Sequence, residues 1–332
     1  MSGRRNFSNW AYWRLHLDRA SAALPARPAD DEQWRAHTRA ELGALLGSHP
    51  APVPLDLEVT DEVDCGDYTR TRIVFDVEDT MSVPAFLLVP HARRAARPGP
   101  AVLAIHGHGP GKSLVCGLDE GGPGDDYAHA LAALGYVVLA PDMRAFGERA
   151  DWMPDEKYEC DWDLVCATMA GVVPHARNLW DLQRSLDVLA AHPLVDGDRL
   201  GACGLSYGAT CTLFLAAIDE RVRAAIVACY LSSWLSAHRM PWNMCGSQIL
   251  PGQIGAIEHL DVSSLIAPRA LLAENGVEDL IFPVEAARET VASLRRVYDA
   301  LGAPAGAVVH DVFDGGHQWH GVQEPEFLEE WL

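Results

Sequence analysis

The segment Gly204-Leu205-Ser206-Tyr207-Gly208 carries the strongest chemical signal in the sequence. A serine between two glycines, directly after an apolar strand and at the start of a helix, is typical of a nucleophile held at a sharp turn. Glycines are needed there because the chain segments on either side of the turn approach each other closely. The helix start also places partial positive charge where an oxyanion would develop. The segment therefore predicts Ser206 as a nucleophile.

A serine nucleophile needs a base that is itself oriented by an acid, and on a sheet of this type the chain order is serine, acid, histidine. Asp279 is the predicted acid because it follows the apolar segment 270–274. Glu278 and Glu274 are its alternatives, since each lies in or directly after the same segment.

The predicted base is His317, which follows Gly315 and Gly316 after the last apolar segment of the chain. Two glycines allow the loop to turn back over the sheet. His320 is the competing histidine. The order 206, 279, 317 agrees with the expected order of such a triad.

A second set of donors for an oxyanion is expected in the loop after an early strand. The apolar segment 101–105 runs into His106-Gly107-His108-Gly109. Backbone amides do this work, so the predicted donors are the N–H groups of His108 and Tyr207. His106 is expected to brace the loop rather than to react.

These side chains require a sheet to bring them together, and the sequence predicts one. Apolar and polar residues alternate in 55–59 and 73–77, and with the run 83–89 this favours antiparallel strands at the start of the sheet. From residue 100 onward, short apolar strands alternate with helices, which is typical of a doubly wound, mainly parallel α/β sheet. The expected strands cover 101–105, 136–140, 200–205, 224–229, 270–274 and 307–312, and the expected helices cover 127–134, 176–191, 206–217 and 284–301.

The domain organisation follows from the same patterns. Residues 1–50 show apolar residues at helical spacing and are predicted to form an N-terminal helical extension. Residues 51–332 form the predicted catalytic domain. Two long segments near 143–175 and 230–265 are rich in Trp, Met and Pro, and such insertions often act as lids or binding loops.

Composition excludes several classes of partner. The chain has 332 residues with 26 Lys and Arg against 46 Asp and Glu, so its net charge is −20. Nucleic acids and anionic membranes are bound through basic patches, so neither is an expected partner. No run of 18 apolar residues is present, so no membrane span is expected. Eight cysteines without a CxxC pair favour the reducing cytoplasm.

A metal-dependent hydrolase is a separate alternative, because His106 and His108, and also His317 and His320, are closely spaced. No third ligand with matching spacing accompanies these pairs in the sequence. We therefore expect no metal and no cofactor.

The ordered motifs resemble the α/β-hydrolase superfamily, and within it the dienelactone-hydrolase-like and acetyl-xylan-esterase-like branch, across residues 55–325. This resemblance implies ester hydrolysis, with Ser206 as nucleophile, Asp279 as acid and His317 as base. It implies a small-molecule ester as the partner. The segments that carry it are 106–109, 141–147, 204–208, 219–222, Asp279 with Pro283, and 316–317.

The resulting hypothesis is a serine hydrolase that cleaves a carboxylic ester through an acyl-enzyme. An acyltransferase, a lyase, a lactone or amide hydrolase, or a binding module on the same fold are the alternatives, because fold does not fix the reaction. Arg144 is a candidate substrate contact, with a loop-fixing salt bridge as its other interpretation. Trp234 and Trp242 are candidate pocket residues, with packing as theirs. The N-terminal helices could support a homo-oligomer.

Overall fold

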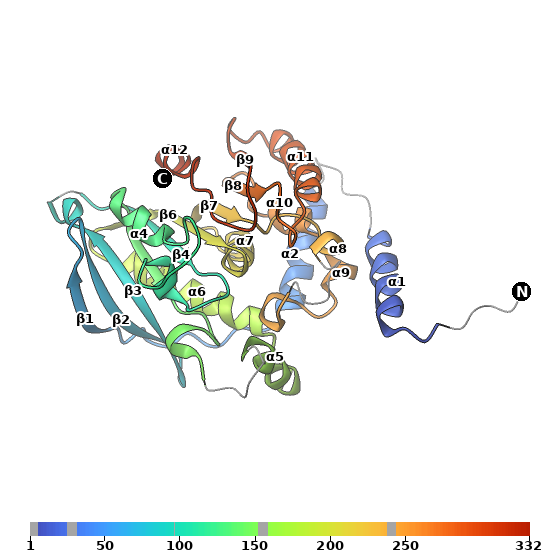
Figure 1. The fold of residues 1–332 in the computed structure, drawn as a ribbon, viewed down its shortest axis with the longest axis horizontal. Helices are drawn as coiled ribbons and strands as arrows, with labels where there is room; N and C mark the ends of the chain where they lie inside the picture. Colours follow the sequence, from blue (N-terminus) through green and yellow to red (C-terminus); the bar gives the residue numbers. More distant parts are fainter. Residues whose placement is uncertain (1–5, 25–31, 96, 152–158, 238–243) are drawn as a thin grey trace, which may run out of the picture.

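The computed structural model describes residues 6–24, 32–95, 97–151, 159–237 and 244–332. Its centre is a nine-stranded sheet in the order β1-β2-β3-β5-β4-β6-β7-β8-β9 (Figure 1). The strands are β1 Glu58–Asp64, β2 Tyr68–Glu78, β3 Met81–Pro90, β4 Gly99–Ile105, β5 Val137–Pro141, β6 Val195–Leu205, β7 Val222–Ala228, β8 Ala270–Gly276 and β9 Val308–Phe313.

The first three strands form an antiparallel meander, and β3 pairs antiparallel with β5. From β5 through β4, β6, β7 and β8 to β9 every neighbouring pair is parallel. The predicted doubly wound, mainly parallel sheet with antiparallel strands at its start is confirmed. One detail differs: β1 begins at Glu58, so Leu55 and Leu57 precede it, although the Leu55 carbonyl still accepts the Asp76 amide at 2.7 Å.

Helices cover both faces of this sheet. They are α1 Asn9–Ala22, α2 Glu32–Leu46, α3 Lys112–Val115, α4 Tyr127–Ala133, α5 Glu159–Ala170, α6 Pro174–Ala191, α7 Tyr207–Ile218, α8 Trp234–Ala237, α9 Gln253–Ala256, α10 His259–Ser264, α11 Val284–Ala300 and α12 Glu324–Trp331. Short 3₁₀ turns are η1 His91–Ala95, η2 Gly147–Arg149 and η3 Gly246–Gln248.

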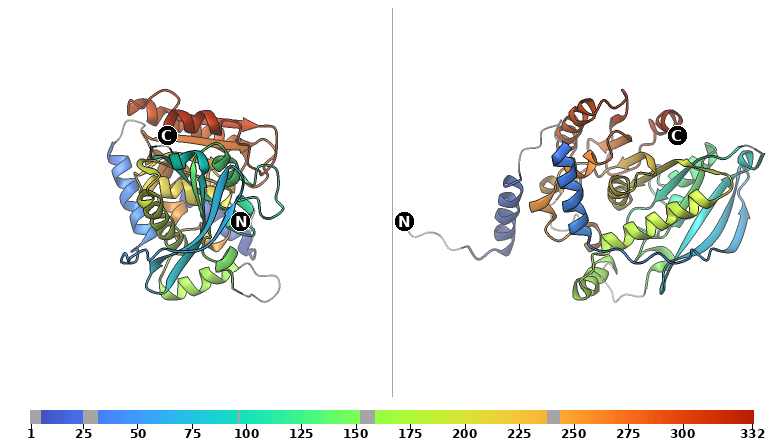
Figure 2. Two further views of the ribbon diagram at one scale, coloured as in Figure 1. Left: turned by 90° about the vertical axis from the view of Figure 1, so that its left-hand side faces the viewer. Right: turned by 180° about the vertical axis from the view of Figure 1, so that it is seen from behind.

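Burial on two faces explains why the central strands are continuously apolar. On β4, Leu103 and Ile105 belong to one core cluster together with α6, α7 and α11, whereas Val102 and Ala104 belong to a second cluster together with α4 and α12. Alternate side chains of a strand point to opposite faces, so a strand covered on both faces must be apolar at every position. Figure 2 shows α6 lying along one face of the sheet.

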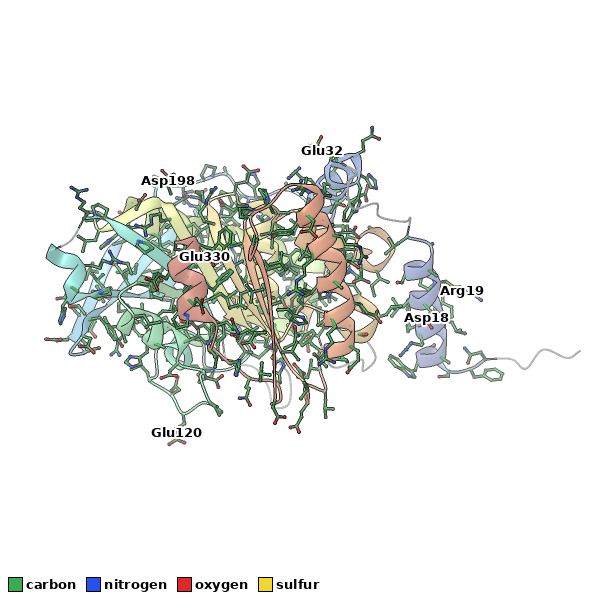
Figure 3. All side chains as sticks on the ribbon, turned by 90° about the horizontal axis from the view of Figure 1, so that it is seen from above. Asp18, Arg19, Glu32, Glu120, Asp198 and Glu330 are labelled. Atoms are coloured by element: carbon green, nitrogen blue, oxygen red, sulfur yellow. The ribbon has the colours of Figure 1, made fainter. Side chains whose placement is uncertain are left out.

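The N-terminal extension is helical, as predicted, and its two helices differ in how they pack. Helix α2 lies against α10, where the Trp34 indole donates to Asp261 at 2.6 Å and Leu42 enters the core. Helix α1 has no buried residue and stands at the edge of the molecule, as Asp18 and Arg19 show in Figure 3.

The two predicted insertions contain more helix than their sequence pattern indicates. Segment 143–175 holds α5, and segment 230–265 holds α8, η3, α9 and α10. Helix α5 buries Cys160 but exposes Trp162, Val165 and Met169, so its apolar residues lie on more than one face and do not form the single core-facing stripe that would have predicted it. Among the described residues, none of the helices is both long enough and apolar enough to cross a membrane.

Candidate active site

Ser206 occupies the bend between β6 and α7. Its backbone angles are φ 59° and ψ −116°, a conformation that costs free energy for a residue with a side chain. Two backbone hydrogen bonds hold it there: the Ser206 amide donates to the Ala228 carbonyl at 3.0 Å, and the Thr210 amide donates to the Ser206 carbonyl at 2.9 Å. Surrounding structure thus fixes a strained serine at the end of a central strand, as the sequence motif predicted.

The two glycines of the motif are required by packing. A Cβ atom on Gly204 would lie 2.4 Å from the Gly208 carbonyl carbon, and one on Gly208 would lie 2.0 Å from the Ile105 carbonyl oxygen. Both added Cβ atoms would contact backbone atoms, and displacing the backbone to relieve the overlap would cost free energy. The bend therefore brings β6, α7 and the end of β4 into direct contact.

Gly208→Ala is expected to lower the free energy of unfolding by at least the ~1–3 kcal/mol typical of overpacking. The added methyl would overlap the Ile105 carbonyl. Urea unfolding measures this change. The matched control is Gly43→Ala in the interior of α2, where a Cβ meets nothing within 4 Å. That variant should be neutral or up to ~1 kcal/mol more stable. Equal stability of the two variants would contradict the close packing.

Asp279 and His317 form a hydrogen-bonded pair after β8 and β9. His317 Nδ1 lies 2.9 Å from Asp279 Oδ2, and the Asp279 side chain is buried. The other carboxylate oxygen accepts the amides of Ile281 at 2.7 Å and Phe282 at 3.1 Å. A buried carboxylate held in this way fixes Nδ1 as the donor and leaves Nε2 available to take a proton.

The neighbouring Glu278 is exposed, and its amide donates to the Gly315 carbonyl at 2.9 Å. No hydrogen bond joins its carboxylate to a histidine in the described part of the chain. Of the two adjacent acids, the structure brings only Asp279 to His317.

The sheet brings the serine to the same edge as this pair. Strands β6, β7, β8 and β9 are parallel neighbours, so the segments after them meet at one edge. Cys229, directly after β7, bridges them: its Sγ lies 3.3 Å from the Gln318 carbonyl, and the ligand atoms of Cys229, Asp279 and His317 all lie within 4.8 Å of one another. No hydrogen bond joins Ser206 Oγ to His317 within the described ranges, and such bonds are often long before substrate binds.

Cys229 is not among the site residues that the sequence predicts. It is buried, but its place beside the acid–base pair follows from register, because Ala228 pairs with both Leu205 and Glu274. Its position one residue past the end of a parallel strand was the signal available in the sequence.

The 106–109 loop lies against the serine bend. A Cβ on Gly107 would lie 3.0 Å from the Leu205 carbonyl oxygen and 3.6 Å from Ser206 Cβ. Tyr207 is the first residue of α7, so its amide is one of the N–H groups that has no partner within the helix. The loop carrying His108 and the start of α7 therefore meet beside the nucleophile.

His106 braces this loop from within the core. Its Nδ1 donates to the Gly107 carbonyl at 2.7 Å, and its Nε2 accepts the Met143 amide at 3.0 Å. Burial lowers the pKa of His106, which agrees with a neutral ring that donates on one side and accepts on the other.

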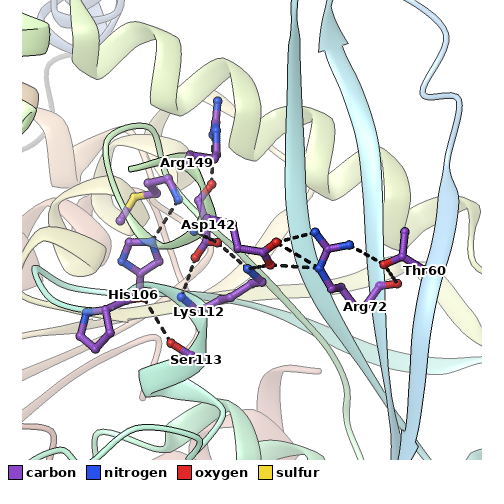
Figure 4. A network of polar contacts seen from close by, with 10 residues as sticks. Thr60, Arg72, His106, Lys112, Ser113, Asp142 and Arg149 are labelled. Carbon is purple, nitrogen blue, oxygen red and sulfur yellow. Dashed lines mark hydrogen bonds and ion pairs between the residues drawn. The ribbon is translucent and has the colours of Figure 1, made fainter. Parts of the chain in front are cut away.

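An ion-pair network, buried at Lys112 and Asp142 and partly exposed at Glu148 and Arg72, anchors the other end of the loop (Figure 4). The Lys112 amide donates to Asp142 at 2.8 Å, and Lys112 Nζ contacts Asp142 at 2.5 Å and Glu148 at 2.6 Å. Arg72 on β2 holds Glu148 from the other side, and this hydrogen bond is the main cause that lowers the pKa of Glu148 to about 2. The network ties the loop, the segment after β5 and β2 together.

Glu274 and His320 form a second polar cluster behind His317. Glu274 is fully buried and accepts the amides of His320 at 3.3 Å and Gly321 at 3.0 Å. His320 Nδ1 pairs with Asp311 at 2.6 Å. Glu274, the alternative acid, and His320, the alternative base, therefore both help to hold the loop that carries His317. Burial is the main cause that raises the pKa of Glu274 to about 7.

This raised pKa predicts a pH dependence of stability. The folded chain holds the Glu274 proton more tightly than the unfolded chain, so stability falls as pH rises from 4.5 to about 7 and stays reduced above that range. Glu274→Gln is expected to remove on the order of 3 kcal/mol of this fall. Urea unfolding at a series of pH values measures the slope. Exposed Glu278→Gln is the control and should leave the slope unchanged; a slope of unchanged size in Glu274→Gln would refute the assignment. Some slope should remain, because burial also raises the pKa of Glu324, to about 8.

The structure corrects two of the predicted substrate contacts. The Arg144 guanidinium is engaged by Asp181 at 2.9 and 2.8 Å and by Glu78, so it forms the salt bridge that fixes the loop. Trp234 is fully buried, and its indole donates to the Ile257 carbonyl at 2.7 Å, so it packs in the core instead of lining an open pocket. Trp242 lies outside the described residues.

A cavity of about 520 Å³ lies away from this site. It is apolar and opens between the antiparallel strands and the end of α6, where Ile73, Leu87 and Val188 contribute. The chemistry-bearing side chains do not line it, so it has no part in the site.

Comparison with known proteins agrees with this architecture. Residues 95–235 match the dienelactone hydrolase family. A protein of Bacillus subtilis (strain 168) named "Putative hydrolase YtaP" is 28% identical over 315 residues, which cover 90% of this chain and 100% of the relative.

Two solved structures resemble the whole chain. A "putative acetyl xylan esterase" from Bacteroides fragilis NCTC 9343 has a TM-score of 0.76 at 17% identity and covers 95% of this chain and 84% of its own. Glucuronoyl esterase from Solibacter usitatus has a TM-score of 0.65 at 17% identity and covers 91% of this chain and 94% of its own. At this identity the two structures bear on the fold alone, and the predicted α/β-hydrolase fold is confirmed. The match over residues 95–235 agrees with the predicted resemblance to dienelactone hydrolases.

Proposed function

Because the chain is an α/β-hydrolase whose residues 95–235 match the dienelactone hydrolase family, we propose that it cleaves carboxylic esters through Ser206, His317 and Asp279. The single observation that carries this proposal is the common edge of the sheet. There Ser206 lies on a strained bend after β6. The buried Asp279 carboxylate after β8 is paired with His317 after β9. A nucleophile, a base and an orienting acid are the groups that acyl transfer requires.

In the proposed mechanism, Ser206 Oγ attacks the acyl carbonyl while His317 Nε2 takes its proton. The backbone amides of Tyr207 and His108 donate to the oxyanion of the tetrahedral intermediate. His317 then protonates the leaving alcohol, which departs and leaves an acyl-enzyme. Water, deprotonated by His317, attacks the acyl carbon. The bond to Ser206 Oγ then breaks, His317 returns the proton to Oγ, and the acid is released. Asp279 stays ionised throughout and stabilises the imidazolium that forms at each step.

Labelling with a fluorophosphonate probe tests the nucleophile directly. We expect one adduct per chain, mapped by peptide mass spectrometry to Ser206, and loss of the adduct after preincubation with an ester substrate. An adduct on another serine, or no adduct on a folded chain, would refute the proposed role.

The proposed partner is a small-molecule ester, and a screen of esters, lactones and amides would define its class. Product analysis with added alcohols or amines separates hydrolysis from acyl transfer, the main alternative on this fold. The metal-dependent alternative predicts that chelation abolishes ester cleavage while the fluorophosphonate fails to do so. The serine mechanism predicts the reverse.

We also propose a cytoplasmic location and a homo-oligomer. The cysteines of the chain are free, which accords with a reducing cytoplasm. A homo-oligomer through the N-terminal helices is the second, and Trp10 and Trp13 on the exposed side of α1 would be its contact residues. Size measurement in solution would test it.

A further inference from the structure

We propose that His108, Cys160 and Cys245 form a binding site for a soft divalent cation such as Zn²⁺, beside the candidate active site. One ligand atom from each of the three lies within 4.8 Å of the other two. They come from segments that are distant in sequence: the loop after β4, the first turn of α5, and the residue before η3. The proposal departs from the expectation of no metal, and it does not depend on the proposed ester hydrolysis.

The donor set suits zinc. Two thiolates and one imidazole are the protein ligands of a Cys₂His site, which leaves the fourth tetrahedral position for water or another small ligand. With Zn–S bonds of ~2.3 Å, two sulfurs on one tetrahedron lie about 3.8 Å apart. The present upper limit of 4.8 Å therefore requires a movement of no more than about an ångström to bring the ligands together.

The three side chains already lie together. Cys160 is buried and Cys245 half-buried, and one ligand atom of each lies within 4.8 Å of the other and of a His108 ring nitrogen. A thiolate is the form of cysteine that binds metals, so metal binding at this cluster would release the thiol protons.

The backbone around the cluster is tightly packed. The Gly246 amide donates to Asp161 Oδ1 at 3.1 Å, and a Cβ on Gly246 would lie 2.4 Å from Leu164 Cβ and 3.0 Å from the Cys160 carbonyl oxygen. Helix α5 and the 244–248 segment are therefore held against each other without a metal. Such preorganisation lowers the entropy that a metal would otherwise have to remove on binding.

The position of the cluster connects it to the candidate active site. The His108 ring lies 5.2 Å from the Tyr207 ring and 5.4 Å from the Phe146 ring, measured between centroids. A metal held by His108 would fix the same loop whose backbone faces the serine bend. It would also tie that loop to α5 through Cys160.

The test uses the full chain, reduced and freed of metals, titrated with Co²⁺ and then with Zn²⁺ against a competing chelator. We expect one cation per chain, with the thiolate-to-cobalt charge-transfer absorption that sulfur ligands produce. Cys160→Ser and Cys245→Ser should each weaken binding by more than the roughly 10–100-fold that loss of an outer-shell partner costs. Cys166→Ser is the matched control, because Cys166 lies on the same helix and is exposed.

A second measurement keeps the proposal falsifiable if a variant folds poorly. In the wild-type chain, bound Zn²⁺ should protect Cys160 and Cys245 from alkylation and leave Cys166 reactive. Any one of three results would overturn the site. These are absence of the thiolate-to-cobalt charge-transfer absorption, equal metal binding by Cys160→Ser and wild type, and no metal binding after a Cys160–Cys245 disulfide has been reduced. Fluorophosphonate labelling of Ser206 is recorded separately, so failure of one proposal leaves the other assessable.

Discussion

Ser206→Ala is expected to lower kcat for p-nitrophenyl acetate by about 10⁴-fold or more, because no acyl-enzyme can form without the hydroxyl. Removal of a triad serine typically leaves only the rate that the oxyanion donors and substrate binding provide. The substitution should leave the fold intact, since alanine meets the same backbone strain at φ 59° as serine does. Initial rates measured alongside urea unfolding would separate lost chemistry from lost structure.

The control for this variant is Ser293→Ala on α11, where the hydroxyl is exposed and donates only to the Glu289 carbonyl of its own helix. Its turnover should equal that of wild type. Wild-type turnover in a folded Ser206→Ala chain would show that another group attacks the ester.

Asp279→Asn is expected to lower kcat by about 10⁴-fold with little change in fold. Asparagine has one acceptor oxygen, so it cannot accept from the Ile281 and Phe282 amides and from Nδ1 as the two carboxylate oxygens do. With its oxygen on the amides, its NH₂ group would face Nδ1, and the imidazole would lose the tautomer that leaves Nε2 free. Because the acid acts through orientation and charge, the loss should be in kcat and not in substrate binding.

Glu278→Gln is the matched control, one residue away and exposed. It should retain wild-type turnover, since its carboxylate does not contact His317. A large loss in Glu278→Gln together with full activity in Asp279→Asn would reverse the assignment of the acid and require a different loop conformation on substrate binding.

Much of the fold follows from local sequence. The apolar runs between 101 and 312 predicted the parallel strands to within a few residues, because strands buried on both faces must be apolar throughout. The boundaries of β6 differ most: it starts at Val195, before the apolar run at 200, since Val195 pairs with Gly99 ahead of an irregularity that ends at Leu200. Helix α5 was missed because its apolar residues lie on more than one face: Cys160 is buried, whereas Trp162, Val165 and Met169 are exposed.

In the candidate site, too, some features could be predicted from the sequence and others only from the structure. Ser206, Asp279 and His317 were chosen from motif order, and this order works because parallel strands bring their carboxyl ends to one edge. The roles of Arg144 and Trp234 could not be chosen from sequence. Both residue types suit a ligand or a packing role, and only their partners decide between them.

The amino-acid sequence alone determined the alternation of strands and helices, the glycine-flanked bend at Ser206 and the order of nucleophile, acid and base, because these depend on periodicity and on residues near in the chain. Tertiary structure decided which carboxylate meets His317 and that Glu274 supports the loop from behind. It also decided that His108, Cys160 and Cys245 come together. These outcomes depend on contacts between segments far apart in sequence, and such contacts are set by how the strands pair and how the connecting loops pack over them.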